Sequence, residues 1–227
     1  MKMLQVKSLF FFLILLMSGA SIAQEKINQL DAQGRRTGVW KKYYDNKNIR
    51  YEGQFFEGKE IGVFNYFSEQ NTKHPMLVKS FSEGSDIAKV SYFYEDGMLQ
   101  SEGSMNGLNR IGKWTYYNTD GKTIVSEENY ENGLLNGIST TFFSAGKKAQ
   151  TAMYKNGELH GNLLRYSSEG IVLDDLHYEN GKLHGPAKYY KLAGKLVRKG
   201  DYENDLKVGN WEYFENGEAT TVNKIKE

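Results

Sequence analysis

Cysteine is absent from the 227 residues of the chain, and proline occurs only twice, at Pro75 and Pro186. A chain without cysteine forms no disulfides, so its fold must be held by packing and by hydrogen bonds between segments. With so little proline and no low-complexity stretch, no segment has the composition of a linker. The sequence therefore predicts one domain or one continuous array.

An excess of charge of one sign is also missing. The chain has 29 basic and 28 acidic residues, and lysine and glutamate are interspersed throughout. A nucleic-acid-binding protein would show a basic patch or stripe, so we expect no nucleic acid partner. Signatures of serine hydrolases, zinc proteases, phosphate-binding loops and calcium loops are absent. We therefore expect no enzyme activity and no cofactor.

Long hydrophobic runs are absent except near the N-terminus. Lys2 and Lys7 precede an apolar run over residues 9–17, and small residues follow up to Ala23. This pattern is typical of a secretory signal peptide, and the run is short of the ~20 residues that span a bilayer. We predict a signal peptide over residues 1–23 and an exported, periplasmic or extracellular protein with no transmembrane span after cleavage. An uncleaved anchor is the alternative.

Glycine, by contrast, returns at an interval of about 24 residues, and an aromatic residue stands five positions after each copy. The glycines are Gly38, Gly62, Gly112, Gly137, Gly161, Gly185 and Gly209. A fixed period of this length indicates a chain built by stacking one supersecondary unit. Residues 24–227 are therefore predicted to form a single repeat array.

Each unit has the composition of a β-hairpin. Two short segments rich in aromatic and β-branched residues are separated by glycine-centred turns, and no window shows a sustained helical period. Asn-Gly pairs such as Asn132-Gly133 and Asn156-Gly157 suit tight hairpin turns, which need positive φ. The predicted fold class is all-β, an antiparallel sheet of consecutive hairpins, which must twist or curl at this length.

One repeat departs from the pattern. Gly62 and Gly112 are two periods apart, and Ala88 stands where a glycine is expected between them. Extra residues also fall around 68–78. We expect an irregular repeat with a longer loop around residues 68–88.

Two lines of aromatic residues are predicted to run along the sheet as structural ladders, because equivalent residues of neighbouring hairpins come close together. The first follows the repeat glycine by five positions: Tyr43, Phe67, Phe93, Tyr117, Phe142, Tyr166, Tyr190 and Phe214. The second lies on the other strand and includes Tyr130, Tyr154, Tyr178 and Tyr202.

A third, broken line supplies the candidate binding face. It occupies the second and fourth positions after the glycine, on the face opposite the fifth position: Trp40, Phe64, Tyr66, Trp114, Tyr116, Trp211 and Tyr213. Exposed aromatic patches commonly mark partner sites. The alternative is that these rings pack on one another as core.

Metal binding and acid chemistry find little support. His160 and His184 occupy equivalent positions in successive repeats, but a two-histidine site needs further ligands. Asp174 and Asp175 are adjacent, so they would point to opposite faces of a strand rather than across a cleft. We expect no metal site and solvated aspartates.

The segments Gly38-Val-Trp40, Gly112-Lys-Trp114 and Gly209-Asn-Trp211, with their following tyrosines and Tyr-x-Asn-Gly closings, resemble the MORN-type repeat. The likeness is closer to its bacterial variant, found in proteins labelled as YwqK-family antitoxins, and covers most of residues 34–220. It implies an elongated, twisted sheet of hairpins that serves as a scaffold for protein or membrane contacts.

Three functions fit these observations. The first is an exported, non-enzymatic scaffold that binds a protein or cell-envelope partner through its aromatic face or a sheet edge. The second is a carbohydrate- or choline-binding surface module, since short aromatic hairpin repeats also serve that purpose. The third is an antitoxin or immunity protein, although an export signal sits poorly with an intracellular toxin.

Overall fold

The computed structural model describes residues 26–215 and 218–220. The predicted signal peptide lies outside these residues, so its assignment stays a prediction. None of the described residues is helical.

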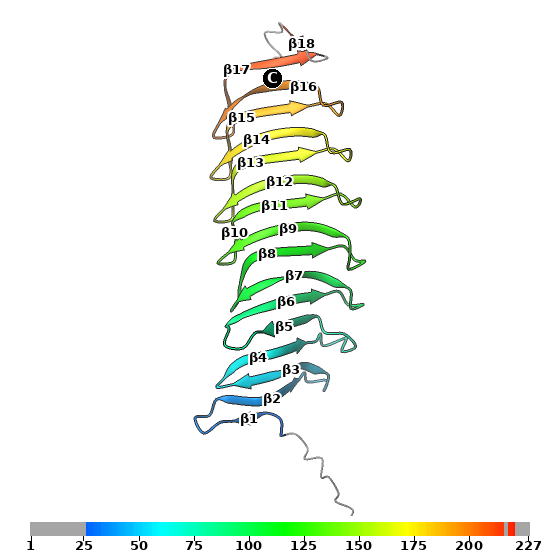
Figure 1. Ribbon diagram of the computed structural model, residues 1–227, viewed down its shortest axis with the longest axis vertical. Helices are drawn as coiled ribbons and strands as arrows, with labels where there is room; N and C mark the ends of the chain where they lie inside the picture. The colour runs from blue at the N-terminus through cyan, green and yellow to red at the C-terminus, as the bar shows by residue number, and fades with distance from the viewer. Residues whose placement is uncertain (1–25, 216–217, 221–227) are drawn as a thin grey trace, which may run out of the picture.

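The described chain forms one antiparallel sheet in which each strand pairs with the next, except that β10 and β11 both pair with β9 (Figure 1). Its strands are β1 (Gln29–Leu30), β2 (Arg36–Tyr43), β3 (Ile49–Phe56), β4 (Lys59–Tyr66), β5 (Leu77–Phe81), β6 (Ile87–Phe93), β7 (Leu99–Asn106), β8 (Asn109–Tyr117), β9 (Ile124–Glu131), β10 (Leu134–Leu135), β11 (Gly137–Phe142), β12 (Lys148–Lys155), β13 (Glu158–Tyr166), β14 (Val172–Glu179), β15 (Lys182–Tyr190), β16 (Leu196–Glu203), β17 (Leu206–Glu215) and β18 (Glu218–Ala219). The predicted all-β fold of consecutive hairpins is confirmed.

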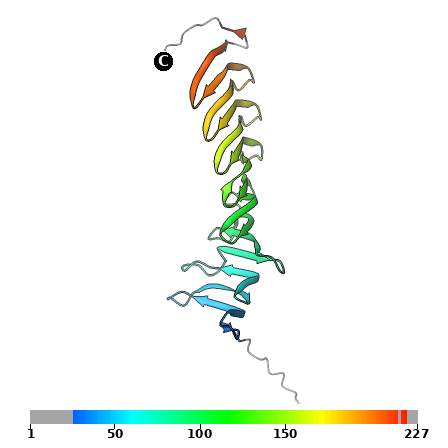
Figure 2. The ribbon, with the colours of Figure 1, turned by 90° about the vertical axis from the view of Figure 1, so that its left-hand side faces the viewer.

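The hairpins stack along the long axis of the molecule as a single layer. Figure 2 shows this layer from the side, with hairpins that change orientation from the blue end to the red end. Such a change is the cumulative result of the twist between neighbouring strands. Since residues 26–215 and 218–220 form no second layer, the apolar side chains of the sheet must bury one another.

The repeat glycines mark a bulge in the strand pairing. Ile61 and Asn65 of β4 pair with Gln54 and Glu52 of β3. The two β4 residues are four positions apart, whereas their partners in β3 are two positions apart. The same offset recurs at Gly112, Gly161, Gly185 and Gly209. All seven repeat glycines have φ between 64° and 101°, a region that glycine enters without steric cost.

The irregular repeat lacks this bulge. Strands β5 and β6 pair without interruption from Leu77 opposite Tyr92 to Phe81 opposite Ala88. Ala88 is only 3% exposed and is not among the residues with positive φ. Alanine thus keeps regular strand geometry where glycine would allow the bulge, and residues 67–76 form a long connection before β5.

Hydrogen bonds also link the closing turns of successive repeats. The amide of Gly58 donates to the Arg36 carbonyl at 2.9 Å, and Gly133 donates to Arg110 at 3.0 Å. Equivalent bonds run from Gly157 to Leu135, from Gly181 to Leu159 and from Asp205 to Leu183. Among the described residues, the turns at 82–86 and 107–108 form no such bond. A groove of about 870 Å³ is lined by the 82–86 turn, and a second of about 400 Å³ borders it at Asp86.

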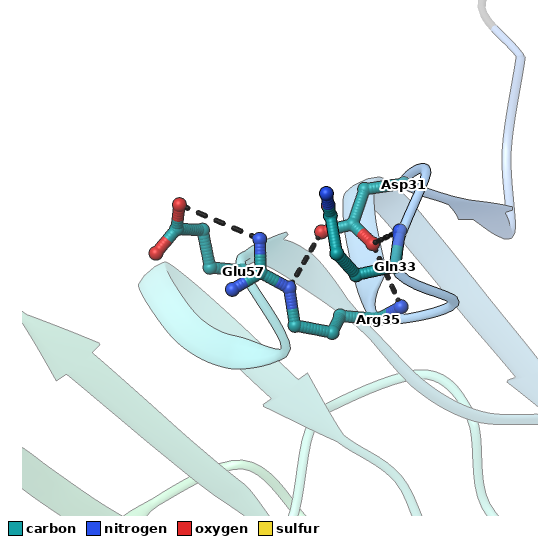
Figure 3. Close-up of polar contacts among 4 residues, drawn as sticks. All are labelled: Asp31, Gln33, Arg35 and Glu57. Carbon is teal, nitrogen blue, oxygen red and sulfur yellow. Dashed lines mark hydrogen bonds and ion pairs between the residues drawn. The ribbon is translucent and has the colours of Figure 1, made fainter.

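The first turn of the array is held by a carboxylate (Figure 3). Asp31 accepts hydrogen bonds from the backbone amides of Gln33 and Arg35 and from the Arg35 side chain, each at 2.8 to 2.9 Å. The hydrogen bonds from the Arg35 amide, the Arg35 side chain and the Gln33 amide lower the pKa of Asp31. Arg35 also lies 3.5 Å from Glu57, which ties this turn to the turn between β3 and β4.

Candidate binding face

One face of the sheet, called the aromatic face here, carries the rings at the second and fourth positions of the repeat. Register and alternation place the second-strand rings on the same face. Trp40 contacts Phe55 at a centroid distance of 5.8 Å, and Tyr202 contacts Trp211 at 5.0 Å. The second ladder therefore packs against the candidate binding line.

Two of the seven candidate binding residues are core residues. Phe64 and Trp114 are 0% exposed, so the expectation that they line an open face is wrong for this pair. Each ring lies over a glycine of the neighbouring strand: a Cβ built on Gly53 would be 2.5 Å from Phe64, and one on Gly103 would be 2.4 Å from Trp114. The ring fills the space that the missing side chain leaves.

This packing follows a rule of compensating size between residues eleven positions apart. Gly53 precedes Phe64, Gly103 precedes Trp114, and Gly200 precedes Trp211, whose ring would be 2.4 Å from a Cβ. In the middle repeats the pairs become Ala152 with Leu163 and Leu176 with Ala187, all of them buried. A small residue on one strand thus accompanies a large one on the next, as close packing requires.

The remaining five candidates, Trp40, Tyr66, Tyr116, Trp211 and Tyr213, are half-buried. The indole nitrogen of Trp40 donates to the Gln29 carbonyl at 3.1 Å, and that of Trp211 donates to the Asp201 carbonyl at 3.2 Å. Their ring surfaces are the part of the aromatic face that a partner can contact.

Cations lie over the three tryptophan rings of the aromatic face, a feature that the sequence pattern did not lead us to expect. Arg36 lies 5.2 Å from the Trp40 ring, Arg110 lies 4.7 Å from Trp114, and Lys207 lies 5.0 Å from Trp211. Each cation stands four residues before its tryptophan, and this spacing was visible in the sequence. The equivalent positions in the middle repeats, where the tryptophan is absent, hold Leu135, Leu159 and Leu183. Guanidinium and ammonium groups favour ring faces electrostatically.

A chain of hydroxyl groups extends from Arg110. Its Nη1 atom donates to the Tyr116 hydroxyl at 2.9 Å, which lies 3.0 Å from the Tyr130 hydroxyl. Tyr130 in turn donates to Glu128 at 2.6 Å. Burial, followed by the hydrogen bond with Tyr130, raises the pKa of Tyr116. Because Tyr130 donates to the carboxylate, Tyr116 donates to Tyr130, and all the protons point towards Glu128.

Arg110 also lines a cavity of about 540 Å³, called the tyrosine pocket here. Its aromatic residues are Tyr92, Tyr94, Tyr116 and Tyr117, and its polar residues include Gln100, Ser101 and Asn118. The pocket combines an arginine with several hydroxyl and amide groups, which suits a polar or anionic ligand group.

The first ladder, the rings at the fifth position after the repeat glycine, borders the opposite face. It lies near the inner turns, which join the two strands of each repeat. Tyr43 is 50% exposed, and Tyr117 donates to Glu102 at 2.7 Å. This hydrogen bond, with some burial, raises the pKa of Tyr117 to about 12. Lys199 lies 5.8 Å from the Phe214 ring. Tyr117 and Phe214 of this ladder thus contact charged groups.

Ion pairs cross the strands of the opposite face. Lys41 pairs with Glu52 at 3.0 Å. Lys113 pairs with Glu127 at 2.6 Å, and Lys199 pairs with Glu212 at 3.1 Å. Carboxylates of neighbouring strands thus neutralise these three lysines.

No group of three or more metal-ligating side chains occurs among the described residues. His184 lies 3.7 Å from Glu179, and the Nδ1 atom of His160 is buried without a hydrogen-bond partner. Asp174 is 7% exposed and pairs with Arg165, so the expectation of a solvated side chain is wrong for this aspartate. It neutralises an arginine on the aromatic face.

Stacked hairpins whose apolar side chains pack on one face, in two buried clusters, define a β-hairpin repeat protein of the solenoid type. The family model described as "MORN repeat variant" matches residues 36–57, 88–106 and 183–204. These three segments are thus similar to the MORN repeat variant, a family whose repeats generally serve as non-catalytic scaffolds. The second match begins at Ala88, so the irregular repeat still fits the family pattern.

A search of curated proteins finds no match. The narrower likeness to YwqK-family antitoxins stays a prediction. In the part of the chain that the structure describes, no helix is both long and apolar enough to cross a membrane.

Proposed function

We propose that this protein is an exported, non-enzymatic scaffold that binds a partner protein along its aromatic face. The observation that carries the proposal is the arrangement of half-buried rings and cations along one face of a single-layer sheet. Tyrosine, tryptophan and arginine are the residues that most often dominate binding energy at protein interfaces. Their distribution along an elongated sheet suits an elongated partner segment.

Site-specific photocrosslinking tests the face. A photoreactive phenylalanine analogue at Tyr66 or Tyr213 should crosslink a discrete protein in cells, because both side chains lie on the aromatic face. The same analogue at Val63 or Ile138, which are each 54% exposed on the opposite face, is the control. Equal crosslinking from both faces, or none from the aromatic face, would refute the proposal.

Export is supported by the N-terminal pattern of basic, apolar and small residues. Cell fractionation should find the mature chain outside the cytoplasm, beginning at Gln24 by N-terminal sequencing. Replacement of apolar residues in the 9–17 run with lysines should retain the precursor in the cytoplasm. A cytoplasmic protein with an intact N-terminus would contradict export.

The alternatives are weaker on the contacts observed. Choline recognition uses aromatic rings to hold a quaternary ammonium group, but Arg36, Arg110 and Lys207 already cover the tryptophan faces. An immunity role rests on family likeness alone, and co-expression with neighbouring gene products would test it.

A further inference from the structure

We propose that the aromatic face binds an extended acidic segment of the partner protein, and that the tyrosine pocket at Arg110 receives one of its carboxylates. This inference rests on the proposed function and adds the chemistry of the partner. It follows from four cations of the aromatic face that lie over rings and form no ion pair with a described residue.

The aromatic face holds cations that have no carboxylate partner. Arg36, Arg110, Arg198 and Lys207 lie over aromatic rings at 4.1 to 5.2 Å. None of the four forms an ion pair with any described residue, whereas the lysines of the opposite face at positions 113 and 199 each do. The formal net charge of the chain is only +1, so these four cations are a local group and do not reflect a strongly basic chain.

Three acidic residues of the aromatic face are already engaged. Glu60 accepts from Tyr66 at 2.7 Å and from Lys79 at 3.4 Å. Glu128 accepts from Tyr130, and Asp174 pairs with Arg165. The face therefore offers an incoming acidic segment cations rather than free carboxylates, which favours association electrostatically.

Arg110 is the strongest anchor because it is half-buried and lines a cavity. Only its Nη1 atom donates hydrogen bonds to described residues, both of them to tyrosine hydroxyls. A guanidinium has five N–H donors in a planar fork, and a carboxylate accepts two of them in parallel. A carboxylate in the tyrosine pocket would give this partly desolvated cation the counter-ion that it lacks.

A protein segment fits the face better than a membrane or a nucleic acid. The sheet twists along its length (Figure 2), so Arg36 at one end and Lys207 at the other cannot both face one flat bilayer surface. Single-stranded nucleic acids bind by stacking bases on exposed rings, but Trp114 is fully buried and cations cover Trp40 and Trp211. An extended peptide can follow a twisted surface.

The test measures binding of a fluorescein-labelled peptide of about ten glutamates by anisotropy at low salt, with a glutamine peptide of equal length as the reference. We expect binding of the glutamate peptide alone. The Arg110→Gln substitution should weaken it about tenfold, which corresponds to about 1.4 kcal/mol. The matched control is Lys113→Gln, which removes the same charge from the same strand on the opposite face and should change affinity less than twofold.

Circular dichroism and thermal melts check that both variants fold, and Arg110→Lys, which keeps the charge, should bind better than Arg110→Gln. Equal weakening by both glutamine variants would overturn the inference, since it would show a net-charge effect. Stronger binding to anionic vesicles or to oligothymidine than to the glutamate peptide would also overturn it. If crosslinking from Tyr66 and Tyr213 persists while the glutamate peptide does not bind, the proposed function stands and this inference falls.

Discussion

At the scale of single residues, glycine serves two separate needs in this protein. Gly112 has a φ of 64°, and a Cβ at this position would meet no other atom within 4 Å, so its role is conformational. Gly103 has an ordinary φ, but a Cβ there would lie 2.4 Å from Trp114, so its role is to make room. The same residue type thus supports the bulge on one strand and the buried ring on another.

These roles predict different responses to alanine. Gly112→Ala should cost about 1–2 kcal/mol of stability, the strain of a left-handed side chain. Gly103→Ala should cost about 1–3 kcal/mol from overpacking, and adding Trp114→Leu should recover part of that loss by reproducing the Ala152 and Leu163 pair. Urea unfolding measures both. If the losses of unfolding free energy from Gly103→Ala and Trp114→Leu simply add in the double variant, the proposed size compensation is wrong.

The Tyr117 hydroxyl provides a pH-dependent prediction. Its hydrogen bond to Glu102 raises the folded-state pKa to about 12 from 10.0. The resulting stability is full below pH 10 and is lost as the pH rises through about 12, because the unfolded chain ionises first.

Ultraviolet titration of tyrosinate, compared with a Tyr117→Phe variant, measures this group. Glu102→Gln should lower the pKa of Tyr117 towards its ordinary value of 10.0. An unchanged titration in the Glu102→Gln variant would show that the carboxylate does not set it.

At the scale of elements, the hairpins were predictable because their turn chemistry is local. Asn132, Asn156 and Asn180 have φ near 50° and are each followed by a glycine of positive φ, as Asn-Gly pairs imply. The bulges and the burial of Phe64 and Trp114 were not predictable in the same way, because they depend on the neighbouring strand. The spacing of eleven residues between each small residue and its ring was the signal for them.

The inner turn over residues 118–123 is expected to depend on Asp120. The Thr123 hydroxyl and the amides of Thr123 and Lys122 donate to its carboxylate, and these bonds lower its pKa to about 2. Since the folded pKa is below the ordinary value of 3.8, the stabilisation is present above that pH and is lost as the pH falls through about 2.

Carboxyl-detected NMR titration checks the value directly. Thr123→Val removes the donor with the largest effect and should move the midpoint of Asp120 towards 3.8. A midpoint that stays near 2 in this variant would contradict the assignment.

At the scale of the whole molecule, the turn-to-turn hydrogen bonds divide the array at the irregular repeat. From Gly133 to Asp205, each closing turn donates a hydrogen bond to the preceding repeat. The turns at 82–86 and 107–108 form no such bond to described residues. The missing bulge at Ala88 and the long connection at residues 67–76 lie in the same region. Repeat arrays are held by contacts between neighbours, so this region should open most readily.

Hydrogen exchange monitored by mass spectrometry tests this expectation. Peptides covering residues 67–76 and 82–86 should exchange faster than those covering the turns at Gly157 and Gly181. The Gly200→Ala substitution, which clashes with Trp211, should reduce protection in β15 to β17 and leave β2 to β4 unchanged. Uniform loss of protection along the array would instead indicate a single cooperative unit.

The eleven-residue pairing also limits how this protein can change its repeat number. Each pair joins the second strand of one repeat to the first strand of the next, as Gly103 in β7 does with Trp114 in β8. Duplicating or transposing a repeat therefore creates new junctions between strands. A junction of Gly103 with Ala187 would leave a void, whereas a junction of Leu176 with Trp114 would cause a steric clash. The order of the repeats is thus encoded in their volumes, and only recombination between repeats of the same pair type should yield a stable array.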